Sequence, residues 1–577
     1  MRCRRANVST SEPLLGIDLG TTNSLVGVFT PEGPQLIPNA LGSFMTPSAV
    51  GVSDDGTLLI GQAAKDRLVS HPDKTTARFK RYMGTDHEVR LGKKSWRAEE
   101  LSSLILRTLR DDAEAHLGQT AERAIISVPA YFNDVQRQAT MAAARLAGLK
   151  VERLINEPTA AALAYGLQDR DAETTFLVVD LGGGTFDVSI LEMFSGVMEV
   201  RASSGDAFLG GEDFTDLLLS HLAKKSDLKP EKLKAEDYSR LRAVTDKLKH
   251  KLTEAPEAGA IFSYKNQAIE LSISREDFEE VCVPLTKRIR LPIQRAIADA
   301  GLKAQDINRI LLVGGATRMD CVRGLITRLF KRFPEHDINP DHVVALGAAV
   351  QAGLAARHEA LDDMVMTDVA PFTLGYETAM EIKRDTYEYG HFTPLIERNT
   401  VVPVSRSHTI FPIKKGQDRI EVKVFQGESP FVKDNVKIGN VTIALPRNKN
   451  DLEPVDLRFT YDNSGILEVV AKAMTSGEEA RVVIEGNPGA MTQADIEARL
   501  EALSGLKIHP REQQENTAFL ARLSALYEGL LGDDRMLVGG FIREFEAALH
   551  SQDVKLIAET RNALEDPVSR LEAQDVF

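Results

Sequence analysis

Cysteine is scarce in this chain of 577 residues, which contains Cys3, Cys282 and Cys321 and no others. The three are far apart and none belongs to a CxxC pair, so the sequence predicts neither a disulfide framework nor a zinc site. We interpret them as ordinary core or surface thiols of a protein in a reducing compartment.

Long apolar runs and excess positive charge are also missing. No stretch approaches the length of a membrane span, and Arg2, Arg4 and Arg5 are followed by polar residues instead of a signal-peptide core. The net charge of −14 argues against nucleic acid as the main partner. We therefore expect a cytoplasmic protein without membrane contact, and its length suggests about three or four domains.

Two apolar, β-branched runs flank an acid and three glycines in Phe176–Leu191, FLVVDLGGGTFDVSIL. This pattern predicts a β-hairpin. We expect Gly182, Gly183 and Gly184 to form a positive-φ turn whose bare N–H groups approach a phosphate, with the hydroxyl of Thr185 at its tip. Asp180 would repel phosphate directly, so we expect it to hold a cation or metal-bound water. A hairpin without any ligand is an equally good interpretation of this stretch alone.

The same layout occurs a second time in Leu14–Phe29, LLGIDLGTTNSLVGVF, with Asp18 at the place of Asp180 and Gly20 at that of Gly182. The repeat predicts two similar subdomains that face each other across a cleft and present their turns to one polyphosphate. Neither copy is a Walker A loop or a dinucleotide-binding fingerprint, because GxxxxGK[ST] and a helix-opening GxGxxG are both absent.

Short apolar strands alternate with amphipathic helices from about residue 14 to 360, which is typical of an α/β fold. A strand is expected to end at Pro129, and Asn133 with Gln136 predicts a capping box that begins a helix. Pro158 suits a first helical position, which leaves Glu157 at the mouth of a helix beside the cleft. Alternatively, Glu157 complements only the helix dipole.

Further glycine pairs occur in FLGGED at Phe208 and in LLVGGATR at Leu311. Gly314 and Gly315 would let a flat ring approach the backbone, while Arg318 can stack on the ring or pair with an acid. The charged helix expected over residues 241–252 would by itself indicate a solvated surface. Its polar residues at one-turn spacings are Asp246, Lys249 and His250, with Thr253 just beyond.

The pattern changes after residue 360. An apolar run bracketed by acids, Asp362–Val369, predicts a linker that can add a strand to a sheet edge. Period-two alternation from Pro371 to Glu485 predicts an antiparallel β-sandwich. From a capping box at Thr492 and Asp495 the period is helical, which predicts a small bundle. Its apolar stripes are Ile496, Leu500 and Leu503, then Phe519, Leu523, Leu526 and Leu530, then Phe541, Phe545 and Leu549.

With these features identified, the chain resembles the seventy-kilodalton heat-shock chaperone family, the DnaK-like proteins, over nearly its whole length. The motifs that carry the resemblance, in family order, are GIDLGTTNS at Gly16, ISVPAYFNDVQRQAT at Ile126, INEPTAAALAYG at Ile155, VVDLGGGTFDVSIL at Val178, LGGEDF at Leu209, LVGGATRM at Leu312 and NPDHVVALGAAVQAG at Asn339. The segments HPDKTTARFKRYMG and IERNTVVPVSR look most like the specialised HscC branch.

The resemblance implies an α/β actin-like two-lobed ATPase domain over residues 1–361 and a linker over 362–369. An antiparallel β-sandwich that binds peptide would follow over 370–486, with a short α-helical lid over 487–577. The implied function is that of an ATP-dependent chaperone, an ATP hydrolase that controls binding and release of extended apolar polypeptides. The implied cofactors are ATP or ADP, Mg²⁺ and K⁺.

The resemblance also implies a role for each matching residue in the ATPase domain. Lys80 would be the catalytic lysine, supported by Glu157, Asp187 and Thr185, and Asp18 and Asp180 would hold the metal ions largely through water. Residues implied to bind the nucleotide are Gly20, Thr21, Thr22, Asn23, Gly182, Gly183, Gly184, Thr185, Gly210, Gly211, Glu212, Asp246, Lys249, His250, Thr253, Gly314, Gly315, Arg318 and Asp341. His250 departs from the Arg or Ile usual in the family.

Coupling and client binding are implied in the same way. Coupling residues would be Pro129, Arg137, Asp363, Val365, Met366 and Asp368. Peptide-binding residues would be Phe372, Leu374, Tyr376, Phe411, Ile420 and Val422. The segment expected to arch over the peptide departs from the family, because Glu381, Lys383, Arg384 and Asp385 replace small and apolar residues, and the lid is short. We therefore expect a chaperone with a narrow range of clients.

Two other classes share the expected fold, namely small-molecule kinases of the sugar-kinase type and actin-like filament ATPases. The sandwich after an apolar linker favours the chaperone, because neither alternative needs a module that captures chains by β-pairing. Expected partners are unfolded polypeptides, a J-domain co-chaperone and a nucleotide exchange factor.

Overall fold

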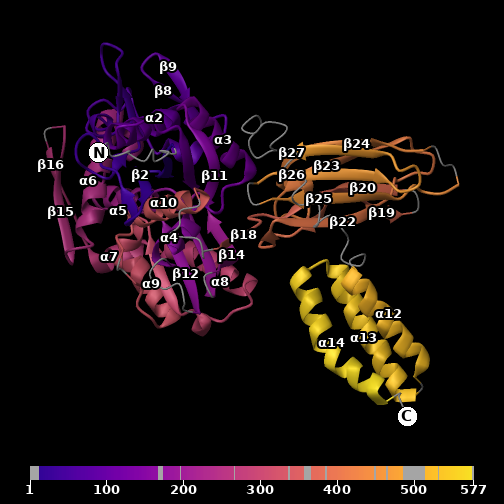
Figure 1. Ribbon diagram of the computed structural model, residues 1–577. Helices are drawn as coiled ribbons and strands as arrows, with labels where there is room; N and C mark the ends of the chain where they lie inside the picture. The colour runs from indigo at the N-terminus through magenta and orange to yellow at the C-terminus, as the bar shows by residue number, and fades with distance from the viewer. Residues whose placement is uncertain are drawn as a thin grey trace, which may run out of the picture.

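The structure is a computed structural model that describes residues 12–574 except 167–172, 195–196, 266, 336–337, 357–364, 384–385, 447–449, 463–464, 485–513 and 531. Three parts follow one another along the chain (Figure 1). We call them the α/β part (residues 12–356), the sandwich (370–484) and the bundle (514–574). Within the described ranges, no helix is long and apolar enough to cross a membrane.

The first sheet of the α/β part combines an antiparallel ribbon with two parallel strands. Its strands in spatial order are β11 (Lys150–Asn156), β10 (Arg123–Val128), β1 (Leu14–Asp18), β2 (Asn23–Thr30) and β3 (Gly33–Leu36), with β4 (Thr46–Pro47) paired to β2. β1 and β2 form the predicted antiparallel hairpin, and β10 runs parallel to β1 on its other side. Smaller elements around this sheet are β5 (Ala49–Val52), β6 (Leu58–Ile60), α1 (Gln62–Lys65), β7 (Thr75–Ala77), β8 (Glu88–Leu91) and β9 (Lys94–Arg97).

The second sheet repeats this plan. Its strands in spatial order are β17 (Arg309–Val313), β12 (Thr174–Leu181), β13 (Phe186–Phe194), β14 (Val197–Asp206), β18 (Val365–Val369) and β21 (Val401–Val402). β12 and β13 form the other predicted hairpin, and β17 lies parallel to β12 just as β10 lies parallel to β1. The internal repeat found in the sequence is therefore a repeat of topology.

Helices cover both sheets. They are α2 (Ala98–Leu117), α3 (Asp134–Leu146), α4 (Glu157–Gly166), α5 (Gly211–Lys225), α6 (Ala235–Lys251), α7 (Arg275–Val281), α8 (Val283–Asp299), α9 (Asp320–Phe330) and α10 (Val343–Ala355), with β15 (Glu257–Tyr264) and β16 (Gln267–Ser274) as a separate hairpin. The predicted capping box of α3 is present, because Asn133 and Gln136 each accept from the other's backbone N–H.

Helix α10 packs with its backbone against its neighbours. A Cβ atom on Gly347 would lie 1.7 Å from the carbonyl oxygen of Ala160 in α4, and one on Gly16 would lie 2.2 Å from the Ala349 nitrogen. Glycine at these positions lets α10 lie directly on β1 and α4. One apolar core consequently joins residues of both sheets, including Ile125 and Val178.

The sandwich consists of two antiparallel sheets, as predicted. One contains β20 (Thr386–Ile396), β19 (Leu374–Lys383), β23 (Arg419–Gln426) and β24 (Val436–Ala444); the other contains β22 (Val404–Ile410), β25 (Val455–Tyr461), β26 (Leu467–Ala473) and β27 (Glu479–Ile484). β19 and β20 stay paired out to Lys383 and Thr386. Glu381 and Lys383 therefore lie on a long hairpin, while Arg384 and Asp385 lie outside the described residues.

The bundle contains α12 (Gln514–Gly529), α13 (Gly532–Ser551) and α14 (Val554–Gln574), drawn in yellow in Figure 1. The predicted stripes form its core: Phe519, Leu523, Leu526, Phe545 and Leu549 are buried, and Leu530 and Phe541 pack against them. The predicted capping box at Thr492 and Asp495 and the stripe Ile496, Leu500 and Leu503 lie outside the described residues.

Candidate active site

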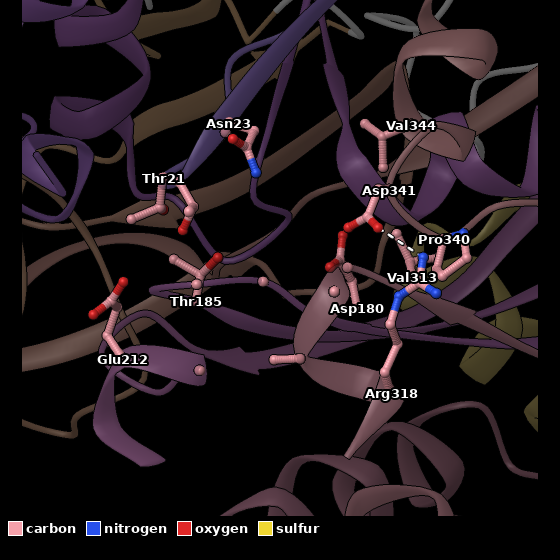
Figure 2. A pocket seen from close by; sticks show the side chains of 18 of the residues that line it. Thr21, Asn23, Asp180, Thr185, Glu212, Val313, Arg318, Pro340, Asp341 and Val344 are labelled. Atoms are coloured by element: carbon pink, nitrogen blue, oxygen red, sulfur yellow. Dashed lines mark hydrogen bonds and ion pairs between the residues drawn. The ribbon is translucent and has the colours of Figure 1, made fainter. Parts of the chain in front are cut away.

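A cavity of about 360 Å³ lies where the turns of the two hairpins meet (Figure 2). Predicted site residues that line it are Asp18, Gly20, Thr21, Thr22, Asn23, Lys80, Glu157, Asp180, Gly182, Gly183, Thr185, Gly211, Glu212, Asp246, Lys249, His250, Thr253, Gly314, Gly315, Arg318 and Asp341. Gly184, Gly210 and Asp187 do not line it. Other residues that line the cavity were not predicted, because they are apolar or helix residues without a local signal: Leu25, Met45, Val313, Ala316, Met319, Pro340 and Val344.

The glycine turn of the β12–β13 hairpin has a different reason for its glycines than we predicted. None of Gly182, Gly183 and Gly184 has a positive φ. Instead, a Cβ on Gly183 would lie 2.1 Å from Thr22 Oγ1, and one on Gly184 would lie 2.9 Å from Thr21 Cγ2. The expectation of a positive-φ turn was wrong; the glycines let the two hairpin turns touch. Gly210 serves the same packing, since its Cβ would lie 2.4 Å from the Gly184 nitrogen.

A buried ion pair lies at the floor of the cavity. Lys80, in the short helix Phe79–Tyr82, places its Nζ atom 2.7 Å from Glu157 Oε1 at the start of α4. Their side chains are 4% and 10% exposed. The Lys80 ammonium also lies 5.6 Å from the centroid of the Phe132 ring. A lysine held in this way is a fixed positive charge facing the cavity.

Three buried aspartates surround this pair. Burial raises the pKa of Asp18 to about 7, with the Glu157 carboxylate adding to the shift, and the Ser127 hydroxyl donates to Asp18 over 2.8 Å. Burial and Glu157 also raise the pKa of Asp187 to about 7 and that of Asp180 well above its usual range. The Lys80 ammonium opposes these shifts, and an added cation beside the acids would favour their ionised forms further.

The residues around Asp18 and Asp180 fit a hydrated cation. Carboxylate oxygens are the ligands that Mg²⁺ prefers, and Mg²⁺ usually keeps several waters. Within the described ranges, no group of three or more His, Cys, Asp or Glu side chains could hold a metal ion directly. A cation between these aspartates would therefore be held mainly through water.

Two helix termini and a loop form the other end of the cavity. Lys249 of α6 donates to the Gly211 carbonyl over 3.0 Å and to Thr215 Oγ1 over 2.7 Å, and it pairs with Asp246 at 2.9 Å. Figure 2 shows Arg318 beside Asp341, with 2.7 Å between Nη2 and Oδ2. Arg318 thus takes the acid-pairing arrangement. The side chain of His250 is 71% exposed.

Hydrogen bonds connect α3 and the end of β11 to the linker strand β18. Arg137 donates to Asn156 Oδ1 over 2.7 Å, and Asn156 donates to both carboxylate oxygens of Asp368 over 3.3 and 3.4 Å. Pro129 lies one turn before Phe132, whose N–H donates to the Pro129 carbonyl. These residues connect the ends of β10 and β11 to β18. Asp363 lies outside the described residues.

A second path passes behind the cavity. Asp187 accepts the N–H of Tyr131 over 2.9 Å, and the Tyr131 ring packs on Phe372 with 4.9 Å between centroids. Phe372 therefore contacts the α/β part and does not face the interior of the sandwich. Among the other predicted peptide-binding residues, Leu374, Tyr376 and Val422 are buried in the sandwich core, Ile420 is half-buried and Phe411 is exposed. The peptide-binding role of these residues stays a prediction.

The linker forms a strand. Val365, Met366 and Thr367 in β18 pair parallel to Val197, Met198 and Glu199 in β14, as the apolar run predicted. Asp368 and Val369 then pair with Val402 and Val401 in β21. One sheet thus extends from the hairpin β12–β13 to the first strand after the β19–β20 hairpin.

Comparison with known families matches residues 14–574 to the Hsp70 protein family. The chain belongs to the Hsp70 family. Similar proteins include the chaperone protein DnaK of Thermosipho melanesiensis, 40% identical over 509 residues, which are 85% of this chain and 83% of the relative. DnaK of Thermotoga maritima is 41% identical over 492 residues, or 82% and 80% of the two chains. DnaK of Thermosipho africanus is 38% identical over 520 residues, or 87% and 85%.

Membership of the Hsp70 family assigns the activity of the cleft. Hsp70 proteins are ATPases whose hydrolysis is coupled to protein folding, and the chain is an ATP hydrolase of this kind. Proteins of the family bind ATP and ADP with Mg²⁺. This agrees with a cavity that is lined by the two hairpin turns and by the carboxylates of Asp18 and Asp180. The resemblance predicted from the motifs is confirmed at the level of the family.

Proposed function

We propose that this Hsp70 protein hydrolyses ATP between its two hairpins and uses the nucleotide state to control an extended-polypeptide site in the sandwich. The observation that carries the proposal is β18, because it pairs with the α/β part through β14 and with the sandwich through β21. A change in the cleft that alters β14 would reach the sandwich through this shared sheet.

Each group of residues in the cleft would have its own chemical role. The turn glycines and Thr21, Thr22 and Asn23 would supply backbone and side-chain donors to the phosphates. Lys80 would orient the attacking water and offset the charge that develops on the transferred phosphoryl group. Mg²⁺, held through water by Asp18 and Asp180, would neutralise charge on the phosphates, and K⁺ is a second proposed ion. Glu157, paired with Lys80 at 2.7 Å, would keep the lysine in place and could accept a proton.

The contacts near the adenosine end suggest what each residue there does. Gly314 approaches the hairpin so closely that a Cβ would lie 2.4 Å from the Leu181 carbonyl oxygen. This glycine therefore lets the loop pack on the hairpin, and a flat ring would lie in the cavity that Gly314, Gly315 and Lys249 line. Arg318 is held by Asp341 and would cover the ring from outside. His250 is too exposed to contribute much burial.

We further propose the narrow range of clients. Supporting it, the hydroxyl of Tyr376 in β19 lies 2.7 Å from Nδ1 of His408, an exposed residue of β22, so a polar contact joins the two sheets at the edge of the core. Glu381 and Lys383 add charge on the β19–β20 hairpin. The HscC branch, a J-domain partner, an exchange factor and a cytoplasmic location stay predictions, as do the boundaries at residues 361, 369 and 486.

A sugar-type kinase and an actin-like filament protein are the alternatives that one experiment separates from the proposal. Unfolded polypeptide is added to the purified chain with radiolabelled ATP. We expect hydrolysis to accelerate while no label is transferred to the polypeptide or to added sugars. Label transfer would support a kinase, and ATP-dependent sedimentation without stimulation would support a filament protein.

A further inference from the structure

Phe44 lies beside the cavity, in the loop between β3 and β4. Its ring makes an edge-to-face contact with the imidazole of His342, with 5.9 Å between the ring centroids and 78° between the ring planes. Phe44 is 42% exposed and belongs to none of the apolar cores within the described ranges. Core packing therefore does not explain the position of this ring. Its neighbour Met45 lines the cavity.

The loop that carries Phe44 is fixed to the first sheet. The side chain of Asn39 accepts the Ser43 N–H over 3.1 Å, and it donates to the Met45 carbonyl over 3.2 Å and to Thr46 Oγ1 over 3.1 Å. Thr46 begins β4, which pairs with β2. One asparagine thus ties the two ends of the loop together, and Phe44 extends from a short, hydrogen-bonded frame.

His342 lies in the turn where the chain passes from the second sheet to helix α10. The Pro340 carbonyl accepts the Gly314 N–H over 3.0 Å just after β17. The N–H groups of His342 and Val343 both donate to the Asn339 carbonyl, over 2.9 and 3.2 Å. Helix α10 then packs on β1 of the first sheet. The position of this turn therefore depends on both sheets.

The same turn holds Arg318. Asn339 Oδ1 accepts from Arg318 Nη2 over 2.9 Å and from the Asp341 N–H over 3.0 Å. Asp341 Oδ2 pairs with Arg318 at 2.7 Å, and both residues line the cavity (Figure 2). His342 follows Asp341 directly. A ring that holds His342 in place therefore also restrains the acid that holds Arg318.

Arg318 depends on such support because its side chain is 50% exposed. An exposed ion pair contributes little to stability, since water competes for both partners. Ordering a long side chain when a ligand binds also costs free energy, and preorganisation in the free protein avoids that cost. The contact between Phe44 and His342 supplies preorganisation from a neighbouring loop.

We infer that Phe44 is a positioning residue for the bound nucleotide: through His342 it restrains the Asp341–Arg318 pair at the adenosine end of the cavity, and it thereby slows the release of ADP. The inference rests on the proposed placement of adenosine at that end. This chain of contacts runs from Phe44 to Arg318 and does not include Lys80. Phe44 should therefore affect nucleotide release and leave the hydrolysis step unchanged.

The test measures the release of mant-ADP, a fluorescent ADP, from the full chain by stopped flow, and single-turnover hydrolysis of ATP by quenched flow. We expect Phe44→Ala to speed the release of mant-ADP about twofold to tenfold, the range that loss of one aromatic pair implies. The rate of single-turnover hydrolysis should stay equal to that of the wild type, because the transition state loses no contact.

Conservative variants show whether the ring itself matters. Phe44→Tyr keeps the edge-to-face contact with His342 and should release mant-ADP as the wild type does. Phe44→Leu keeps an apolar side chain without a ring and should behave like Phe44→Ala. Phe194→Ala removes another phenylalanine of the α/β part, 58% exposed in β13, and is the matched control with wild-type release.

Two further measurements separate positioning from a general loosening of the fold. Arg318→Ala should itself speed release, and adding Phe44→Ala should change little more, because Phe44 acts through Arg318. Hydrogen exchange at the amides of His342 and Val343 in the nucleotide-free chain should quicken in Phe44→Ala. Circular dichroism checks that each variant keeps its fold.

The outcomes distinguish the inference from the proposed function. Unchanged release in both Phe44→Ala and Phe44→Leu would overturn the inference, as would unchanged exchange at His342 or fully additive effects of Phe44→Ala and Arg318→Ala. Faster release from Arg318→Ala in those cases would leave the proposed place of adenosine intact. Wild-type release from Arg318→Ala would refute that placement, and the inference would fail with it.

Discussion

Ion pairs occur both in the cleft and where the sandwich contacts the α/β part, and they differ in how much of each side chain is exposed to water. In the cleft, Lys80 and Glu157 pair with side chains 4% and 10% exposed. At the contact, Arg398 binds Asp299 at the end of α8 over 2.9 and 3.0 Å and Glu428 over 2.8 Å, with its side chain 30% exposed. Asn399 adds bonds to Asp299 and to the Ser203 N–H.

The two pairs differ in how much water reaches them. Removing one partner of a buried pair costs about 3–5 kcal/mol, so the Lys80–Glu157 pair fixes the geometry of the cleft. Exposed ion pairs contribute about 0–1 kcal/mol, and more where an arginine binds a carboxylate through two hydrogen bonds, as Arg398 binds Asp299. Because Arg398 is partly exposed, its contact can exchange protein partners for water at a lower cost than the pair in the cleft.

Removing the buried lysine should have the largest effect. Lys80→Ala should lower the rate of single-turnover ATP hydrolysis by about 10²–10³-fold, because the positive charge of Lys80 offsets the negative charge that develops on the phosphoryl group in the transition state. The affinity for ATP should remain, because the backbone of the two turns supplies it. Quenched-flow hydrolysis and equilibrium binding measure the two quantities. Lys74→Ala, which breaks the exposed pair with Asp54, is the matched control and should behave as the wild type. Comparable rates in both variants would refute the role of Lys80.

The linker strand should give the next largest effect. In β18, Met366 pairs with Met198 of β14, which is fully buried. Val365→Asp combined with Met366→Asp would place charges beside this apolar strand and prevent docking. Basal hydrolysis should remain, and stimulation by peptide should disappear in steady-state assays. Ile261→Asp, at an exposed position in β15, is the control. Full stimulation in the double variant would show that β18 is a passive tether.

A smaller loss is expected at the exposed contact. Arg398→Ala should reduce peptide stimulation about threefold to fivefold, and adding Asp299→Ala should cost little more, because both changes remove one interaction. High salt should shrink the difference from the wild type. Arg97→Ala, which breaks the exposed pair with Asp86, serves as the control. Additive losses at Arg398 and Asp299 would mean that the two residues act separately.

Features that depend on a few neighbouring residues could be predicted from the sequence. Both hairpins, the capping box at Asn133 and the linker strand were predictable, because apolar runs, glycines and caps act within a few residues. The roles of Lys80 and Glu157 came from the family resemblance, and the ion pair between them was not predicted, since nothing local to either residue names its partner. The predicted positive φ at Gly182–Gly184 was wrong because the glycines have another cause. Thr22 of the other hairpin occupies the space that a side chain on Gly183 would need, and only the tertiary structure shows this contact.

The sandwich was less predictable at the level of single residues. Its alternation of apolar residues predicted two antiparallel sheets correctly. However, Phe372 contacts Tyr131 in another part of the chain, and Gln552 reaches Ser407 across a long sequence separation. Pattern identifies the inner face of a strand, but it does not identify which neighbour covers the outer edge.

The smallest expected effect is a pH dependence at Asp368. Burial raises the pKa of this carboxyl in the docked linker above its ordinary value of 3.8, despite Arg153 and Arg137 nearby. Between the ordinary and the raised pKa the docked state binds more protons than the released state, so docking should strengthen as pH falls and weaken as it rises.

Hydrogen exchange of the Val365–Thr367 amides over a pH series that starts near the ordinary pKa of 3.8 and rises from there, corrected for intrinsic rates, measures this change. We expect protection to fall as the pH rises through the raised pKa of Asp368. Asp368→Asn should remove the dependence, because the amide does not titrate. An identical dependence in that variant would assign the effect to another group.

Helix α10 also has a consequence for biosynthesis. It completes the shared core beneath both sheets, and it lies directly on β1, which is synthesised near the start of the chain. Domains fold as units while they leave the ribosome. The nascent chain therefore keeps the apolar face of β1 uncovered until Ala355 has emerged. Throughout that interval the nascent chain itself exposes unfolded polypeptide, the class of client that chaperones of its family bind.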